Sequence, residues 1–166
     1  MYEITPALSA DAPAIEALLD AAFGPDRKSK TSYRFREGVD QVADLSYVIR
    51  EHGRIIGSVS YWPILIGESD FPALLLGPLA VNPLRKNEGI GRALVFKTLD
   101  RAAALGHRLV LLVGDPAYYS RFGFSPAAPA GFDMPGEDPA RLQLRALDPQ
   151  VLNTVRGTIK RSPRVC

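Results

Sequence analysis

The stretch from Gly77 to Leu94 constrains the fold of this chain more than any other segment. Near its start, Leu79-Ala80-Val81 closes a nearly apolar run that is typical of a central strand buried on both faces. A polar loop with two glycines, Gly89 and Gly91, follows and opens directly into an amphipathic helix. The sequence therefore predicts a strand-loop-helix unit inside an α/β domain.

The rest of the chain alternates between strand and helix patterns. In chain order, we expect a strand at 2–4, a helix at 11–23 capped by Ser9, a polar insert at 26–44 with a short helix near 32–37, antiparallel strands at 45–50 and 55–66, a strand at 71–81, a helix at 89–105, a strand at 109–113, a helix from Asp115 to Gly123, a mostly irregular segment at 125–139, and a last strand at 141–147. This order predicts an α/β fold with an antiparallel front half and a parallel crossover. We expect a single domain over residues 1–166, with its core at about 2–147 and a C-terminal tail at 148–166.

A few single residues predict where these elements turn, start or bend. Gly53 can supply the positive φ that a hairpin turn needs after residue 50. Gly106 is placed to cap the long helix at its C-terminus, and Asp115, which precedes Pro116, is placed to cap the next helix at its N-terminus. Pro78 has no N–H to donate, so the buried strand should break or bulge there.

Composition and charge argue against several function classes. The formal net charge is +2 and no run of Lys and Arg forms a basic stripe, so we expect no nucleic-acid partner. Cys166 is the single cysteine, and His52 and His107 share no metal-ligand spacing, so we expect no intrachain disulfide and no metal site. The first residues lack a signal-peptide pattern and no apolar stretch reaches membrane-spanning length, so we expect a cytoplasmic protein without a membrane partner.

The loop between Asn82 and Leu94 has the features of an anion site. Its glycines let the backbone approach a phosphate closely, and the N–H groups at the start of the helix carry partial positive charge toward the same concavity. Arg85, Lys86 and Arg92 add cationic side chains nearby. The combination predicts a pyrophosphate site, although a Gly-x-Gly pattern on its own favours an ordinary strand-to-helix turn.

Two common phosphate-binding loops do not fit this segment, and a third does. The P-loop pattern Gly-x-x-x-x-Gly-Lys-[Ser/Thr] is absent, and a dinucleotide fold would need a small residue where Leu94 stands. The segment instead resembles the acetyl-CoA motif of the GNAT superfamily of N-acetyltransferases, Val-x-Pro-x-x-[Gln/Arg]-x-x-Gly-x-Gly-x-x-Leu. The matching residues are Val81, Pro83, Gly89, Gly91 and Leu94, with Lys86 at the Gln/Arg position.

A second motif follows at the spacing that this family has. The residues from Gly114 to Phe124, Gly-Asp-Pro-Ala-Tyr-Tyr-Ser-Arg-Phe-Gly-Phe, resemble the family's [Phe/Tyr]-Tyr-x-x-x-Gly-Phe segment. The resemblance covers the chain from the first strand to Phe124. It implies a single-domain GNAT-like fold, with a mixed, mostly antiparallel sheet that is flanked by helices and splays between its fourth and fifth strands.

The resemblance also implies how acetyl-CoA, as cosubstrate, would be bound without a metal. The splay would admit the pantetheine arm, the backbone of Leu79 and Val81 would pair with its amides, and the pyrophosphate would lie on the loop from Lys86 to Arg92. The implied cofactor-binding residues are Leu79, Ala80, Val81, Lys86, Asn87, Glu88, Gly89, Ile90, Gly91, Arg92 and Tyr119.

Tyr119 is the catalytic residue that the resemblance implies, because the matching tyrosine of the family protonates the departing CoA thiolate or hydrogen-bonds its sulfur. The alternative is an aromatic side chain packed under the helix. Tyr118 fits that role, since adjacent helical residues face different directions. The strand at 71–81 carries no acidic residue, so we expect water to relay the proton of the amine. We expect the backbone N–H of Val81 to hold the oxyanion.

The implied function is transfer of an acetyl group from acetyl-CoA to a primary amine by direct attack. A non-catalytic acyl-CoA-binding module and an enzyme for a longer acyl-CoA are the alternatives. The acceptor, on a small molecule or a peptide, stays open, and so does a homodimer. The insert at 26–44 is expected to shape specificity. Tyr61 and Trp62 are further candidates for the acceptor pocket, although strand aromatics are more often core residues.

Overall fold

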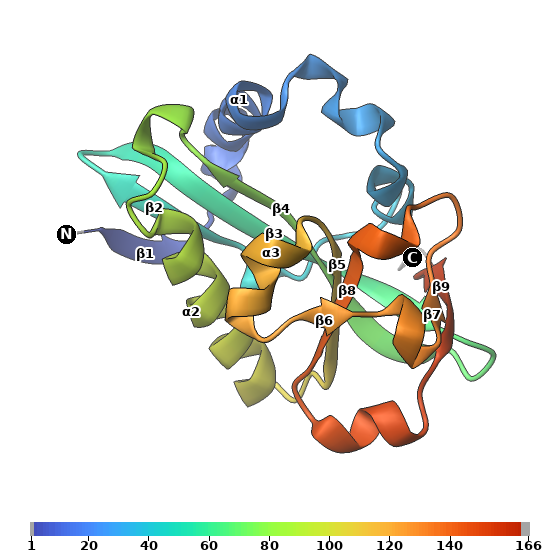
Figure 1. Ribbon diagram of the computed structural model, residues 1–166. Coiled ribbons are helices and arrows are strands. Elements are labelled where there is room, and N and C mark those ends of the chain that lie inside the picture. The colour runs from blue at the N-terminus through green and yellow to red at the C-terminus, as the bar shows by residue number, and fades with distance from the viewer. Residues whose placement is uncertain (1, 164–166) are drawn as a thin grey trace.

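A computed structural model describes residues 2–163 (Figure 1); Met1 and residues 164–166, which include Cys166, lie outside the described part. The α-helices are α1 (Ala12–Phe23), α2 (Ile90–Ala104) and α3 (Pro116–Tyr119). The strands are β1 (Glu3–Pro6), β2 (Tyr47–Glu51), β3 (Arg54–Ile66), β4 (Phe71–Val81), β5 (Leu109–Val113), β6 (Ser125–Pro126), β7 (Phe132–Asp133), β8 (Leu142–Ala146) and β9 (Gly157–Arg161). The polar insert forms short 3-10 turns, among them Pro25–Ser29 and Thr31–Phe35.

The strands form one open sheet in the order β1-β2-β3-β4-β5-β8-β6, to which β9 and β7 are added through β3. The β4–β5 and β7–β9 pairs are parallel, and the other pairs are antiparallel. Helices α1 and α2 cover opposite faces: Ala80 of β4 packs with α1, whereas its neighbours Leu79 and Val81 pack with α2. This is the mixed, mostly antiparallel sheet that the sequence predicts.

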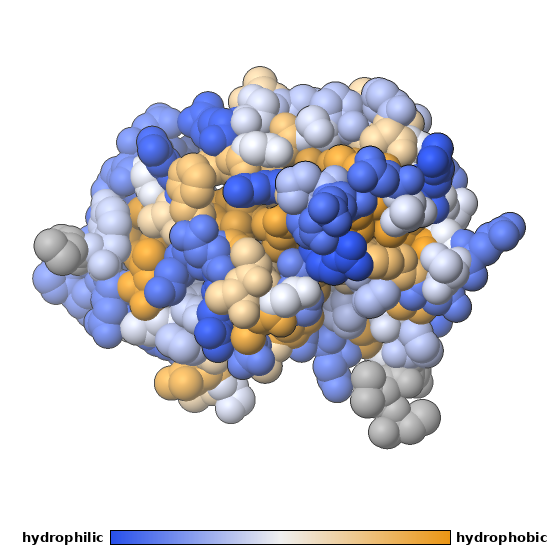
Figure 2. All heavy atoms as spheres, turned by 90° about the horizontal axis from the view of Figure 1, so that it is seen from below, coloured by the Kyte–Doolittle hydropathy of each residue, from blue (hydrophilic) through white to orange (hydrophobic). Residues whose placement is uncertain are grey.

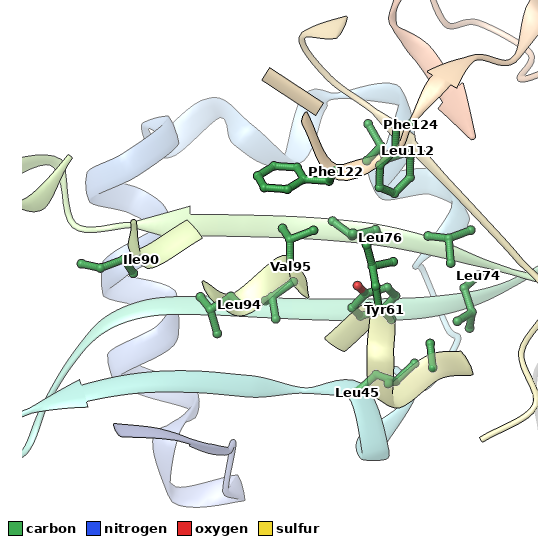
Figure 3. Close-up of a cluster of buried hydrophobic side chains, with 14 of the residues drawn as sticks. Leu45, Tyr61, Leu74, Leu76, Ile90, Leu94, Val95, Leu112, Phe122 and Phe124 are labelled. Atoms are coloured by element: carbon green, nitrogen blue, oxygen red, sulfur yellow. The ribbon is translucent and has the colours of Figure 1, made fainter. Parts of the chain in front are cut away.

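The largest core lies between α2 and the sheet. Leu94 and Val95 of α2 are fully buried and meet Tyr61 of β3 and Leu76 of β4 (Figure 3). The hydroxyl of Tyr61 lies 2.7 Å from Oγ1 of Thr98, so the polar end of this buried side chain has a partner. Tyr61 is therefore a core residue, and the core fixes the N-terminus of α2 beside the end of β4.

Strand β4 departs from regular pairing at Pro78. Its register with β3 shifts between Val59 and Tyr61, where Gly77 and Pro78 together oppose a single residue. This is a β-bulge, and it confirms the disruption expected from a proline without an N–H in a central strand.

Strands β4 and β5 separate soon after they meet. They pair in parallel at Leu74↔Val110 and Leu75↔Leu111, although both strands continue beyond these residues. The splay expected between the fourth and fifth strands is thereby confirmed. It leaves the later part of β4 with an edge that β5 does not pair.

Two expectations from the sequence are wrong. Ser9 does not cap α1, because it lies in a 3-10 turn and Asp11 takes the N-cap position. The strand at 142–146 is not the last one, because β9 pairs with β3 through Ile66↔Ile159. Val151 and Ile159 are buried, so the core extends beyond residue 147 into the expected tail.

Three local expectations are confirmed. Gly53 and Gly106 have φ of 75° and 89°, as their turn and cap require. Asp115 caps α3, because its Oδ1 accepts a hydrogen bond from the N–H of Ala117 at 3.0 Å.

Exposed large hydrophobic side chains are scattered along the chain, for example Leu8, Leu84 and Leu152. On the face shown in Figure 2, hydrophobic stretches are interrupted by hydrophilic side chains. Scattered apolar residues are normal on a protein surface. Across residues 2–163, no helix combines the length and apolar character needed to cross a bilayer.

Candidate active site

A cavity of about 220 Å³ opens where β4 and β5 separate. One wall comes from the bulged part of β4, a second from the end of β5 and α3, and a third from the polar insert. The lining residues are Phe23, Arg27, Lys30, Ser32, Tyr33, Arg36, Leu75, Leu76, Gly77, Pro78, Leu79, Val113, Gly114, Asp115, Tyr119 and Arg141. Residues of β4, of the second sequence motif and of the insert thus meet at the splay.

The backbone of β4 presents alternate residues to this gap. The N–H of Asn82 donates to the carbonyl of Ile56 at 2.8 Å, which makes the pair Gly57↔Val81 a non-hydrogen-bonded one. The N–H and C=O of Val81, and of Leu79 two residues earlier, therefore face away from β3 and toward the gap. Ala80 lies between them, so its own backbone faces β3 and its side chain is buried under α1.

The loop before α2 has an open backbone. Asn87 and Gly89 have φ of 66° and 81°, and Gly89 is the N-cap of α2. A Cβ placed on Gly89 would meet no atom within 4 Å, so the space in front of the helix start is free of protein. The first N–H groups of an α-helix have no partner within the helix and carry partial positive charge. The residues from Lys86 to Gly89 are exposed, and the loop can accept a phosphate through its backbone.

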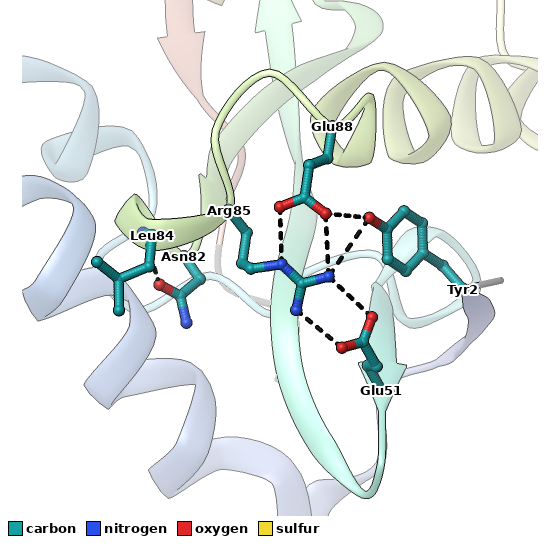
Figure 4. A network of polar contacts seen from close by, with 6 residues as sticks. All are labelled: Tyr2, Glu51, Asn82, Leu84, Arg85 and Glu88. Atoms are coloured by element: carbon teal, nitrogen blue, oxygen red, sulfur yellow. Dashed lines mark hydrogen bonds and ion pairs between the residues drawn. The ribbon is translucent and has the colours of Figure 1, made fainter.

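Arg85 holds this loop in place (Figure 4). Its guanidinium donates to both carboxylate oxygens of Glu51, at 2.9 and 2.8 Å, and to Oε2 of Glu88 at 2.7 Å. The hydroxyl of Tyr2 also bonds to Glu88. The hydrogen bond from Arg85 is the main reason that the pKa of Glu88 falls to about 2. Two carboxylates therefore surround Arg85, which ties the loop to the first strands of the sheet.

Gly91 has a packing role inside the fold. It is buried inside α2. A Cβ on Gly91 would lie 2.6 Å from the hydroxyl oxygen of Tyr118, so this glycine makes room for that side chain. Ile90 is also buried and packs in the core with its side chain. Arg92 is exposed, with its guanidinium 5.5 Å from the ring centre of Phe96.

Tyr119 lies against the backbone of Gly114. A Cβ on Gly114 would be 2.5 Å from Cε2 of Tyr119, so the ring occupies the space that any side chain there would need. Burial raises the pKa of the Tyr119 hydroxyl well above its usual value of 10. The hydroxyl therefore stays protonated at neutral pH and can donate a proton or a hydrogen bond.

Gly114 is itself held from both sides. Its N–H donates to the carbonyl of Arg141 at 3.0 Å, and its carbonyl accepts from Nε2 of Gln143 at 3.0 Å. Gln143 is buried on β8, far along the chain. Sequence reasoning missed both supporting residues. The sequence did offer one signal for a role of Gly114, because this glycine lies between a buried strand and the helix start at Asp115-Pro116.

Trp62 of β3 lies next to the bulge of β4. Trp62 donates from Nε1 to the carbonyl of Gly77 at 2.8 Å, beside the bulge. Trp62 also lines a second cavity of about 360 Å³ under α1. The two cavities share the wall residues Arg27, Tyr33, Arg36 and Pro78. Of the two strand aromatics considered for the acceptor pocket, Trp62 lines this second cavity and Tyr61 lies in the core.

Comparison with known proteins accounts for this arrangement. Residues 3–127 match the family model described as "Acetyltransferase (GNAT) domain". The chain is 35% identical over 153 residues to the uncharacterized N-acetyltransferase YhbS of Escherichia coli (strain K12), with 90% of each protein covered. It is 29% identical over 157 residues to the uncharacterized N-acetyltransferase YjhQ of the same strain, which covers 90% of this chain and 86% of that protein.

Solved structures with a similar fold include acetyltransferases of the same family. The structure of YhbS from Escherichia coli in complex with CoA has a TM-score of 0.84 and 32% identity, and covers 97% of this chain and 89% of that chain. A GNAT family acetyltransferase from Brucella melitensis in complex with acetyl-CoA has a TM-score of 0.73 and 26% identity, and covers 99% of this chain and 97% of that chain. The family model spans the splay, the loop before α2 and Tyr119. The chain therefore belongs to the GNAT family of acetyltransferases.

Proposed function

We propose that this chain transfers an acetyl group from acetyl-CoA to a primary amine, and that the amine attacks the thioester directly. The observation that carries this proposal is the meeting of three features at one splay: gap-facing backbone on β4, an open helix N-terminus, and a protonated tyrosine. The relatives solved with CoA and acetyl-CoA support the choice of cosubstrate.

The residues present fit acetyl-CoA in two places. Leu79 offers its N–H and C=O, and Val81 its C=O, and these can pair with the amides of a pantetheine arm as an added strand would. The N–H groups from Lys86 to Arg92 offer an anion site for the pyrophosphate, since Gly89 leaves the space before α2 open. Because Glu88 is bonded to Arg85, we assign the phosphate contact at this residue to its backbone.

Tyr119 is proposed to donate its proton to the thiolate sulfur as the carbon–sulfur bond breaks. The backbone N–H of Val81 is proposed to donate to the oxygen that gains negative charge. Asp115 is the single carboxylate among the described residues that line the cavity, and its Oδ1 already accepts from Ala117. We therefore propose that water relays the proton of the amine to solvent.

The test is an acetyl-CoA consumption screen against a panel of primary amines, read by the appearance of free thiol. Calorimetry with a chelator present measures the affinity for CoA in parallel. We expect CoA binding without added metal and thiol release that depends on at least one amine. Binding that requires Mg²⁺, or a preference for NAD or ATP over CoA, would contradict the proposal.

A further inference from the structure

Arg36 occupies a central place on the acceptor side of the splay. It follows the 3-10 turn Thr31–Phe35 and lines both cavities. Its Nη2 atom lies 3.0 Å from the position that a Cβ on Gly77 would take, so the guanidinium lies directly over the bulge of β4. Its Cζ atom is 4.4 Å from the ring centre of Tyr33 and 5.9 Å from that of Trp62, and these rings hold it from the side.

Two of the three nitrogens of this guanidinium lack a partner within the described part of the protein. Nε and Nη1 of Arg36 are buried without a hydrogen-bond partner among residues 2–163. Burial lowers the pKa of Arg36 to about 10, so the group still carries its charge at neutral pH. A buried charge is costly unless an opposite charge and hydrogen bonds compensate it. The position therefore calls for an anion from outside the chain.

The other charged groups of the cavity wall differ from Arg36, because each of them is ion-paired or exposed. Arg27 is ion-paired with Glu16 and Asp20, and its charge is thereby neutralised. Lys30 and Arg141 are exposed. Asp115, the carboxylate of the wall, is exposed and caps α3. Arg36 is thus the partly buried cation on the acceptor side, and no carboxylate of the described residues pairs with it.

We infer that the amine acceptor carries a carboxylate and that Arg36 binds this carboxylate beside the splay, an inference that rests on the proposed function. The planar guanidinium fork matches the two oxygens of a carboxylate. Because Arg36 and Tyr119 line the same cavity of about 220 Å³, we place the carboxylate and the reacting amine on one small molecule. Free amino acids and compounds with similarly spaced groups form this class, and the second cavity gives room for an apolar side chain next to Trp62.

Matched pairs of acceptors test this inference in the wild-type enzyme. Leucine is compared with leucinamide, and phenylalanine with phenylalaninamide, by kcat/KM at saturating acetyl-CoA. At neutral pH more of the amine is unprotonated in the amide forms, because its pKa is lower there than in the acids, so a preference for the acids does not come from amine reactivity. We expect the acids to be favoured by about 10- to 100-fold, the range for hydrogen bonds to a charged group. Arg36→Gln should remove this preference, and Arg34→Gln, a change at an exposed neighbour, should keep it.

A binding measurement separates this inference from the proposed function. N-acetyl-leucine and N-acetyl-leucinamide are titrated calorimetrically into the CoA complex, where no turnover is needed. Tighter binding of the acid that disappears in Arg36→Gln supports the carboxylate site, even if no amine of the panel is acetylated. Equal use of acids and amides by an active wild-type enzyme overturns it while acetyl transfer stands. If Arg36→Gln does not fold, Arg36→Lys keeps a charge without the fork and should keep only part of the preference.

Discussion

Replacing Gly114 with alanine would put a methyl group into the ring of Tyr119. The Cβ would lie 2.5 Å from Cε2 and 3.0 Å from Cδ2 of that ring, where ordinary contact needs 3.4–4 Å. Gly114 is not among the glycines with positive φ, so its backbone accepts alanine without strain. The substitution therefore acts through the position of the ring.

The size of the effect follows from these distances. The ring must move by about 1 Å, and a displacement of that size at a reacting group costs about 100-fold in rate. We expect kcat of Gly114→Ala to fall by about this factor with little change in the affinity for CoA, because the anion site before α2 is untouched. Ser120→Ala, at an exposed residue on the turn after Tyr119, is the matched control and should be near wild type.

A double-mutant cycle shows whether the loss comes through the tyrosine hydroxyl. In a Tyr119→Phe background the hydroxyl is already gone, so Gly114→Ala should lower kcat by much less than in wild type. Steady-state thiol release with the best amine of the panel measures all four proteins. An equal loss in both backgrounds, or no loss in the single variant, would refute the reasoning.

Three further predictions concern the loop before α2 and the first turn of that helix. Gly89→Val should weaken CoA binding at least about 10-fold, because φ of 81° strains any branched residue by about 1–3 kcal/mol and the side chain fills the open space. Lys86→Ala should weaken CoA binding by less than about fivefold, as the loss of an exposed charge contact does. Calorimetry with CoA compares the two variants. Gly91→Val should instead lower thermal stability, by about 1–3 kcal/mol, because its side chain meets Tyr118 inside the fold; an unchanged melting temperature would contradict this. The pKa of Glu88 is lowered from 4.5 to about 2 mainly by Arg85, so this contact stabilises the fold above pH 4.5 and is lost as the pH falls toward 2. The difference in unfolding free energy between wild type and Glu88→Gln, from urea titrations, should shrink over that range and stay flat above it.

Features set by neighbouring residues could be predicted from the sequence. The bounds of β4 and β5 follow from their apolar runs, and the bulge follows from Pro78, whose missing N–H acts wherever the strand pairs. The Asp115 cap is likewise local, since the side chain bonds the backbone two residues on. The splay came from a resemblance to a family and not from the residues alone.

Features set by distant residues could not be predicted in this way. Strand β9 is short and its pattern is weak, and it is a strand because Ile159 pairs with Ile66 across the sheet. The role of Gly91 depends on Tyr118, and the role of Gly114 on Tyr119 and Gln143. These contacts form only when the chain is folded.

The partners of two arginines near the site could not be predicted from the sequence either. Arg85 has the position of a phosphate ligand in the sequence, yet Glu51 and Glu88 surround it in the fold. Arg36 lies in a polar insert in which the sequence singles out no binding residue, yet it is held between Tyr33 and Trp62. Neither pairing leaves a periodic signal, because the partners come from different elements.

The most direct test of the proposed mechanism is the turnover number of Tyr119→Phe with a confirmed amine acceptor, measured beside its affinity for acetyl-CoA. This change keeps the ring over Gly114 and removes only the hydroxyl. If Tyr119 protonates the thiolate, kcat should fall by about 10²- to 10⁴-fold, as is usual when a general acid is lost. The dissociation constant for acetyl-CoA and the melting temperature should stay close to wild type, and Tyr118→Phe should be mild in comparison. Normal turnover by Tyr119→Phe would contradict the account and assign the proton to water or another residue.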